Sequence, residues 1–492
     1  MRAHSKTLAL IPGLALALAL AFGLALGLAT ADDAGPSPLA QEPLEKLDDP
    51  FVAVDRAALP RTPGRVVTRG PFTTVQVNVD ALGNNIVGDA ANEPSIAVDP
   101  ADPSRMVIGW RQFDTVSSNF RQAGWGWSAD GGASWTFPGV LEPGIFRSDP
   151  VVGVDNQGVF YYYSLGTPGG GFVNDMFRST DGGMTWSAPF YACGGDKAWF
   201  TLDRSGGIGD GHAYAFWTSS FGCPGATGNF NRSTDGGFNW DPEIFTPNDI
   251  RWGTLDVATD GNLYLIGTGN VGISVLRSSN AQDEGQAVVF DAVTSVDLGG
   301  NLVAFGGGPN PGGLSGQAWI ATNPANGDLY ALASVDPPGL DPLDVHFSRS
   351  TDGGSTWSAP VRVNDDASTS SWQWFATMSV APNGRIDVIW NDTRNSGGFV
   401  SELFYSYSTD GGVTWKPNVA LSPPFDPSVG YPQQNKLGDY YHMVSYNDAA
   451  HLAWAATFNN EQDVYYTRIG GSEIFADGFE SGDTSAWSGT IP

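Results

Sequence analysis

One eight-residue pattern, Ser-x-Asp-Gly-Gly-x-x-Trp, occurs five times in this chain of 492 residues and constrains its fold more than any other feature. The aspartates of successive copies lie 51, 54, 117 and 58 residues apart, and a degenerate copy near Ser278–Phe290 divides the longest interval. A repeat of about 50 residues is typical of folds in which small sheets bury their faces against one another. The intact copies are Ser128–Trp135, Ser179–Trp186, Ser233–Trp240, Ser350–Trp357 and Ser408–Trp415.

A second repeat, which reads as strand, tight turn and strand, precedes each copy. Asn-Gly and Asp-Gly turns such as Asp260-Gly261 and Asn383-Gly384 suit hairpins that need positive φ. Each unit therefore reads as two strands, an Asp-Gly-Gly hairpin and a further strand. The seven units begin near Pro94, Pro150, Ala198, Trp252, Ala318, Phe375 and Tyr441.

The seventh unit has a third strand, Asp463–Arg468, but no Asp-Gly-Gly hairpin. Thr73–Val79 alternates as a strand and lies before the first unit, so it can supply the outer strand of the last sheet. Such a closed ring leaves few exposed edges. The sequence predicts an all-β, seven-bladed propeller over residues 71–471, with six blades as the alternative.

Composition excludes several classes of function. The 24 basic and 52 acidic residues give a net charge of −28, which would repel a nucleic acid. We find no phosphate-binding loop, dinucleotide fingerprint or zinc-type histidine spacing, so no cofactor is expected. The acidity is compatible with calcium, although no Asp-x-Asp-x-Asp-Gly loop is present.

The N-terminus reads as a secretory signal. Arg2 and Lys6 precede an apolar run, Leu8–Leu28, and a small-residue cleavage site, Ala29-Thr30-Ala31. A retained membrane anchor is the alternative. We expect export from a bacterial cytoplasm, a mobile segment over 32–70, no membrane span after cleavage, and a short acidic tail over 472–492.

The five hairpins resemble the Asp-box repeats of sialidases and other bacterial β-propellers. The resemblance implies that they lie on the outer rim, away from the active site. Their carboxylates are then structural, each accepting hydrogen bonds within its own turn. These residues are Asp130, Asp181, Asp235, Asp352 and Asp410.

The resemblance also implies a glycan site on the face formed by the loops between strands 2 and 3 and between blades. Sialidases hold the sugar carboxylate with three arginines and use a tyrosine nucleophile with an aspartate as acid and base. Asp149 or Asp114 is the candidate acid, and Tyr440 or Tyr431 the candidate nucleophile. The candidate substrate-binding residues are Arg111, Arg147, Arg251, Arg394, Trp252 and Trp374.

Structural alternatives stand beside these assignments. Arg147 with Asp149, and Asp392 with Arg394, can form local salt bridges, and the tryptophans can belong to the core. The Phe/Tyr-Arg-Ile-Pro signature of sialidases is absent, and Asn92–Ile96 stands in its place. Three carboxylates precede inner strands and can form a ring that binds a cation or serves as acid and base: Glu93, Asp149 and Asp439.

Cys193 and Cys223 are the only cysteines, and in an exported protein they are expected to form a disulfide. The sequence favours an exported, sialidase-like propeller that recognises a glycan or glycoconjugate and acts as an exo-glycosidase. The alternative is a non-catalytic carbohydrate- or protein-binding module. The residues alone do not decide whether the protein is an enzyme.

Overall fold

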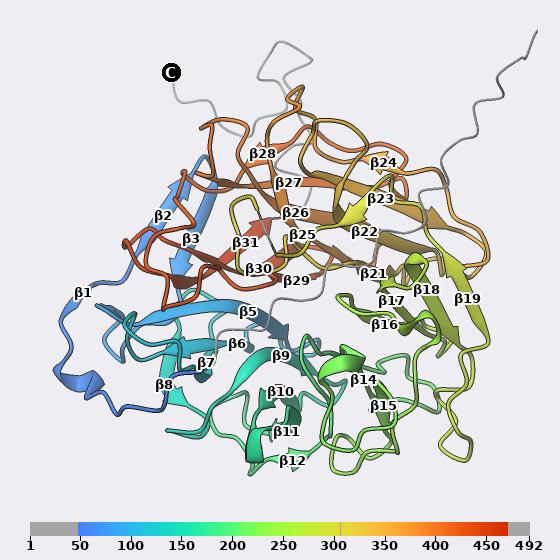
Figure 1. Cartoon of the computed structure of the whole chain (residues 1–492), viewed down its shortest axis with the longest axis horizontal. Coiled ribbons are helices and arrows are strands. Elements are labelled where there is room, and N and C mark those ends of the chain that lie inside the picture. Colours follow the sequence, from blue (N-terminus) through green and yellow to red (C-terminus); the bar gives the residue numbers. More distant parts are fainter. Residues whose placement is uncertain (1–47, 306, 471–492) are drawn as a thin grey trace, which may run out of the picture. The chain divides into compact units, whose positions relative to one another are not determined.

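Seven antiparallel sheets follow one another along the chain and surround a common axis (Figure 1). The computed structural model describes residues 48–305 and 307–470, and the statements below concern these residues. The sheets are the seven predicted blades, numbered here by the order of their inner strands. None of the helices in this part of the chain is long and apolar enough to cross a membrane.

Blades 1 to 4 follow the predicted order from inner to outer strand. Blade 3 has three named strands, and a bridge between Phe230 and Ile244 takes the place of the fourth. The strands are β5 (Ala90–Val98), β6 (Met106–Phe113), β7 (Gln122–Ser128) and β8 (Thr136–Val140); β9 (Ser148–Val154), β10 (Phe160–Gly166), β11 (Val173–Ser179) and β12 (Phe190–Tyr191); β13 (Trp199–Leu202), β14 (Ala213–Phe216) and β15 (Phe230–Ser233); β16 (Leu255–Val257), β17 (Leu263–Gly269), β18 (Gly272–Ser278) and β19 (Ala292–Ser295).

Blades 5 to 7 repeat the pattern with additions at their edges. Four short 3-10 helices lie in the connections: η1 (Arg56–Ala58), η2 (Pro168–Gly170), η3 (Ser219–Phe221) and η4 (Pro247–Asp249). The strands are β21 (Trp319–Thr322), β22 (Leu329–Asp336), β23 (Asp344–Ser350) and β24 (Val361–Arg362), with β20 (Asn301–Leu302) beside β22; β25 (Gln373–Val380), β26 (Ile386–Asp392), β27 (Glu402–Ser408) and β28 (Val419–Ala420); β29 (His442–Ser445), β30 (Ala449–Ala456) and β31 (Asp463–Gly470).

The N-terminal strand closes the ring, as the sequence predicted. β3 (Phe72–Gln76) pairs antiparallel with β31, with Thr74 opposite Thr467, and the two buried hydroxyl oxygens lie 2.7 Å apart. One strand was not anticipated: β2 (Val66–Arg69) pairs with β3 as a fifth strand of blade 7. β1 (Arg61–Pro63) and β4 (Asn84–Ile86) form a separate two-stranded sheet. Strands of three or four residues show too little alternation to be recognised beside Pro60 and Pro63.

Each Asp box is held by its own side chains. In the first copy, Asp130 accepts hydrogen bonds from the backbone amide and the hydroxyl of Ser134, at 2.9 and 2.6 Å. A Cβ on Gly132, which has φ of 84°, would lie 2.3 Å from a Tyr466 ring carbon, so this position requires glycine. The Trp135 ring packs 5.3 Å from the Tyr466 ring of the preceding blade, so the box joins two blades as well as two strands.

The core lies between adjacent blades. Trp110, Trp390 and Trp454, which stand on second strands, are fully buried. Their indole N–H groups donate to Gln112, Asp392 and Thr467, so burial leaves no unpaired donor at these rings. These strands are covered on both faces, so most of their residues are apolar, and polar residues such as Asp387 and His451 are buried as well.

Candidate functional site

The inner strands begin with unusual backbone geometry. Glu93, Asp149, Lys197, Trp252 and Phe375 occupy equivalent positions in five blades, and each has φ between 46° and 60°. This left-handed region costs about 1–3 kcal/mol for a residue with a side chain, and such strain gathers at functional sites. The sequence gives no sign of it, because a positive φ is anticipated from glycine or asparagine.

Three of these five positions, and Asp439 at the start of blade 7, bring charged residues to one end of the axis. We call Glu93, Asp149, Lys197 and Asp439, with Arg111 and Lys436, the axial charge cluster; all six residues are buried. Arg111 Nε lies 3.0 Å from Glu93, and Lys197 and Lys436 lie 3.0 and 3.1 Å from Asp439. Two of the three carboxylates considered from the sequence as a ring therefore contact cations of the protein, and the third, Asp149, accepts the backbone N–H of Lys197 at 2.9 Å.

Burial dominates the electrostatics of this cluster. Desolvation raises the pKa of Glu93 to about 8, against the opposing charge of Arg111. Burial also acts to raise the pKa of Asp439, but Lys197 and Lys436 outweigh it and hold that pKa far below its usual range. The pKa of Tyr440 is raised well above its ordinary value, mainly by burial and then by Glu93 and Asp149.

Two loops, which contain residues 310–314 and 437–439, meet over this end of the axis. Leu314 donates its backbone N–H to Asp439 at 2.8 Å, and Asn310 accepts the N–H of Leu437 at 2.8 Å. Asn310 also donates to the carbonyl of Gly438. The predicted acid Asp149 and the predicted nucleophile Tyr440 thus lie beneath packed protein, and the Tyr440 hydroxyl donates to the Pro150 carbonyl at 2.8 Å.

A cavity of about 400 Å³ occupies the other end of the axis. All seven inner strands line it, and it reaches the turns between first and second strands, on the side where the Asp boxes lie. The sequence placed the site on the opposite face. The rim of the cavity is largely polar and includes Asn156, Arg204, Ser205, Asp256, Thr259, Thr322 and Ser445.

Aromatic side chains from three blades form the inner end of this axial cavity. The Trp199 ring lies 5.2 Å from Trp319 and 5.3 Å from His442, and His442 stacks on Trp319 with 17° between the rings. Tyr440 packs 5.0 Å from Trp199, so it stands between the cavity and the axial charge cluster. Cavities of this size with aromatic walls and a few polar groups are typical ligand sites.

His442 is held in one protonation state. Its Nδ1 accepts the backbone N–H of Ile96 at 3.2 Å, so the neutral ring carries its proton on Nε2. Burial, and then the charge of Arg204, lower the pKa of His442 to about 3. The ring is therefore an uncharged donor throughout the range in which free histidine titrates.

We expect the free energy of unfolding of a His442→Gln variant to fall less with decreasing pH than that of the wild type. The unfolded chain binds the His442 proton near pH 6.5 and the folded chain only near pH 3, so the wild type loses stability as pH falls through this window. One such group changes the free energy of unfolding by at most about 1.4 kcal/mol per pH unit. Urea unfolding at pH 4.5, 5.5 and 6.5 measures the difference; parallel profiles for the two proteins would refute the assignment.

The predicted arginines do not converge. Each lies in a different blade, and three are paired with protein carboxylates. Arg147 bonds Glu142 and Asp175, the latter at 2.7 Å. Arg251 lies over the Trp252 ring, 4.7 Å from its centroid.

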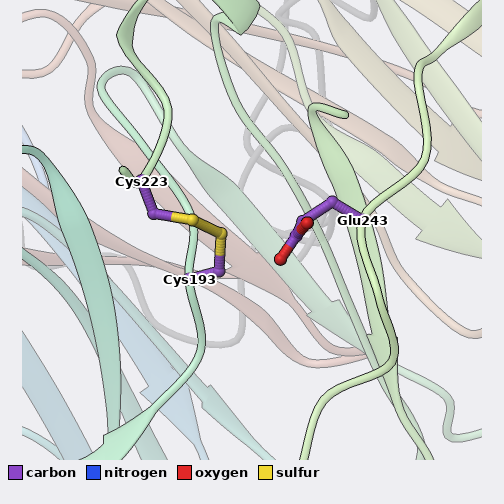
Figure 2. A group of neighbouring side chains, drawn as sticks. All are labelled: Cys193, Cys223 and Glu243. Atoms are coloured by element: carbon purple, nitrogen blue, oxygen red, sulfur yellow. A yellow bond between two sulfur atoms is a disulfide. The ribbon is translucent and has the colours of Figure 1, made fainter. Parts of the chain in front are cut away.

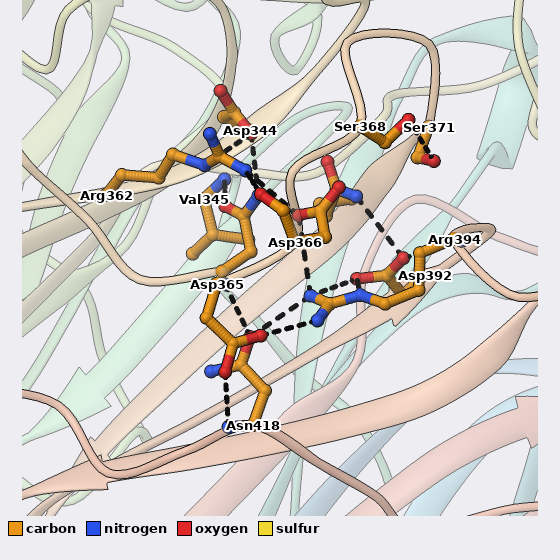
Figure 3. A network of polar contacts seen from close by, with 12 residues as sticks. Asp344, Val345, Arg362, Asp365, Asp366, Ser368, Ser371, Asp392, Arg394 and Asn418 are labelled. Atoms are coloured by element: carbon orange, nitrogen blue, oxygen red, sulfur yellow. Dashed lines mark hydrogen bonds and ion pairs between the residues drawn. The ribbon is translucent and has the colours of Figure 1, made fainter.

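Arg394 is the most completely engaged of the four. Its guanidinium meets Asp392 at 2.8 Å and Asp365 at 2.6 Å, and it donates to Asn418 at 3.0 Å (Figure 3). Asp366 joins Arg394 to Arg362 in the same network. These contacts tie the loops of blades 5 and 6 together, which is the structural alternative weighed from the sequence.

The remaining predicted site residues come from different parts of the ring: Asp114 follows β6, Trp252 precedes β16, Trp374 lies in β25 and Tyr431 lies between β28 and β29. Asp114 accepts from Gln122 at 2.9 Å and pairs with Arg56 at 3.4 Å. Trp374 is fully buried and donates to Ser401, and Trp252 is buried as well. Burial raises the pKa of the half-buried Tyr431 to about 12.

The disulfide predicted between Cys193 and Cys223 is present, with Cα atoms 5.3 Å apart (Figure 2). The Glu243 carboxylate lies close to the two sulfur atoms. Because both sulfurs are oxidised, they offer no thiolate to a metal. In the chain-entropy model this bridge stabilises the fold by about 3–4 kcal/mol.

Sequence reasoning missed Trp319, His442, Arg204 and Asp256 as members of a site. Trp319, His442 and Asp256 stand on inner strands and Arg204 on a first turn, positions the sequence located correctly. The usable signal was the alternation of each inner strand, because every second side chain must face the axis. The resemblance to sialidases points instead to the loops at the other end of the axis.

Two segments match the BNR/Asp-box repeat, residues 177–188 and 406–417. A xyloglucanase from a Paenibacillus species is 27% identical over 328 residues, which cover 58% of this chain; the chain spans only 29% of that protein. A protein of unknown function from Dyadobacter fermentans has a TM-score of 0.47 at 15% identity, covering 83% of this chain and 99% of its own.

Sialidases are among the similar solved structures. A Hadza microbial sialidase has a TM-score of 0.42 and 13% sequence identity, and the match covers 77% of this chain and 66% of the sialidase. Trypanosoma rangeli sialidase has a TM-score of 0.38 and 12% sequence identity, and the match covers 82% of this chain and 60% of the sialidase. The sheet order and the repeat matches together carry the assignment. The chain is a seven-bladed β-propeller built on BNR/Asp-box repeats.

Proposed function

We propose that the protein binds a neutral glycan in the axial cavity. The observation that carries the proposal is the cavity itself, in which Trp199, Trp319 and His442 form an aromatic inner end beneath a rim of hydroxyl and amide groups. Sugar rings offer apolar C–H faces to aromatic rings and hydroxyl groups to polar side chains.

The composition of the cavity favours binding over hydrolysis. Glycosidases ordinarily use two carboxyl groups that flank the scissile bond. Asp256 is the single acidic residue among the described residues lining the cavity. Its Oδ2 accepts from the backbone amide and hydroxyl of Thr322, at 2.7 and 2.9 Å, so its role is to orient the inner strand of blade 5.

Charge favours a neutral glycan over a sialoside. A chain with a net charge of −28 repels anionic sugars at a distance. Three of the four arginines proposed to bind the sialic acid carboxylate already bind carboxylates of the protein: Arg111, Arg147 and Arg394. The similarity to a xyloglucanase makes xyloglucan the first ligand to test.

Export belongs to the same proposal, because it would place the protein where polysaccharides are found. A disulfide in the described part of the chain fits an oxidising compartment. Protein recovered from the medium or periplasm should begin at Asp32, which N-terminal sequencing reads directly; an intact leader in that fraction would contradict export.

A binding and hydrolysis panel tests the function. The protein would be titrated calorimetrically with xyloglucan oligosaccharides, cello-oligosaccharides and sialyllactose, and each sugar would be analysed for cleavage after overnight incubation. We expect saturable binding of a neutral oligosaccharide without cleavage. Cleavage of a sialoside would restore the sialidase hypothesis, and absence of binding across the panel would remove the glycan proposal.

A further inference from the structure

A second cluster of buried carboxylates lies where the ring closes, and none of its residues lines the axial cavity. Asp89 precedes β5, Glu461 precedes β31 and Asp463 begins β31. One oxygen of each residue lies within 4.8 Å of the other two, and all three residues are buried. We call this group the seam cluster.

The seam cluster carries more negative charge than the protein around it neutralises. Arg56 pairs with Asp89 at 3.2 Å, and it is the only cation among the described residues in an ion pair with the three carboxylates. With all three carboxylates ionised, the cluster would hold at least two uncompensated negative charges, because Asp114 shares the Arg56 guanidinium. An uncompensated buried charge is costly, so this arrangement calls for a divalent cation or for bound protons.

One carboxylate oxygen is without a partner. Asp89 Oδ2 accepts from Gln112 at 2.9 Å, whereas Asp89 Oδ1 is buried and meets no donor among the described residues. Buried acceptors are nearly always satisfied, so an orphaned oxygen beside two further carboxylates marks a missing ligand. Glu461 accepts one bond at each oxygen, from Asn85 and from the Gly88 amide, which leaves lone pairs for a cation.

We propose that the seam cluster binds one Ca²⁺ ion, coordinated by Asp89, Glu461 and Asp463. All available donors are oxygens, as hard cations prefer. The point equidistant from three oxygens that lie within 4.8 Å of one another is at most about 2.8 Å from each, so a small inward movement of the side chains would reach the usual Ca²⁺–oxygen distance of about 2.3–2.6 Å. Mg²⁺ prefers shorter bonds and keeps several waters, which suits a buried protein cage less well.

The location gives the ion a structural purpose. Asp89 comes from the segment that leads into blade 1, and Glu461 and Asp463 come from blade 7. Gln76 and Asn78, on and after the closing strand β3, donate to Asp463 at 2.9 and 2.8 Å. A cation here would join the first and last blades at the same seam that β3 closes by pairing with β31.

Calcium titration of the EGTA-stripped protein tests the proposal. We expect calorimetry to find one Ca²⁺ per chain, and the Tm to rise by about 2–5 °C in saturating Ca²⁺. Asp89→Asn and Glu461→Gln should each weaken binding at least tenfold, whereas Asp448→Asn, an exposed acidic residue of the same blade, should bind as the wild type does.

Two results would overturn the proposal. One is the absence of stoichiometric Ca²⁺ binding to the stripped wild type, which would mean that protons neutralise the cluster. The other is Ca²⁺ binding that survives both Asp89→Asn and Glu461→Gln, which would place the ion elsewhere. If either Asp89→Asn or Glu461→Gln does not fold, Ca²⁺ binding by the other variant still tests the site. Neither the calorimetric titration nor the Tm shift depends on glycan binding, so this proposal can fail independently of the proposed function.

Discussion

At pH 9, above the raised pKa of Glu93, replacing Arg111 with methionine should lower the free energy of unfolding by about 3–5 kcal/mol, because it leaves the ionised Glu93 carboxylate buried without its charge partner. Both side chains are completely buried, and they meet at 3.0 Å. Arg111 Nε also donates to Asn92 at 2.8 Å, so the variant loses a hydrogen bond as well. Urea unfolding followed by tryptophan fluorescence measures the loss.

The double variant Arg111→Met with Glu93→Gln separates a structural from a ligand-binding role. Removing both charges should recover much of the lost stability, since an uncharged buried pair carries no desolvation penalty for ions. Glycan affinity should remain within about twofold of the wild type. A variant that keeps its stability but loses ligand binding would instead make Arg111 a substrate-binding residue, as the sialidase resemblance implied.

Filling the axial cavity should abolish glycan binding. Thr201 lines the cavity two residues after Trp199, so both side chains face the axis. A Thr201→Trp substitution would place an indole where the sugar is proposed to lie, and we expect at least a tenfold loss of affinity, or about 1.4 kcal/mol. Thr201→Ser keeps the hydroxyl and the space, so it should bind nearly as the wild type does.

A matched change on the opposite face completes this experiment. Phe399 is exposed in the loop between β26 and β27, where the sequence placed the glycan site. Phe399→Ala should leave affinity unchanged. If Phe399→Ala weakens binding and Thr201→Trp does not, the ligand lies on the loop face and the cavity is not the site.

The fold was predictable because its signals are local and repeated. Five Asp boxes and seven strand pairs gave the blade count, and Thr73–Val79 was identified as the closing strand because the seventh unit lacked one. The disulfide between Cys193 and Cys223 followed from there being only two cysteines. β2 escaped because Val66–Arg69 is too short to show a pattern of its own.

The site was less predictable because it depends on contacts between distant segments. Whether Arg394 is available to a ligand depends on Asp365, 29 residues before it, which no local pattern connects to it. The axial charge cluster is covered because Asn310 meets Leu437, 127 residues later. Sequence placed charged residues at the axis correctly, but only the packed loops show which end of the axis is open.

The most direct measurement is a crystal structure of the protein with a bound xyloglucan oligosaccharide. The account predicts that a sugar ring lies in the axial cavity, against Trp199 and Trp319, with hydroxyl groups near His442 and the polar rim. A sugar bound instead on the loop face, above Asp149 and Arg147, would contradict it and return the function to the glycosidase hypothesis.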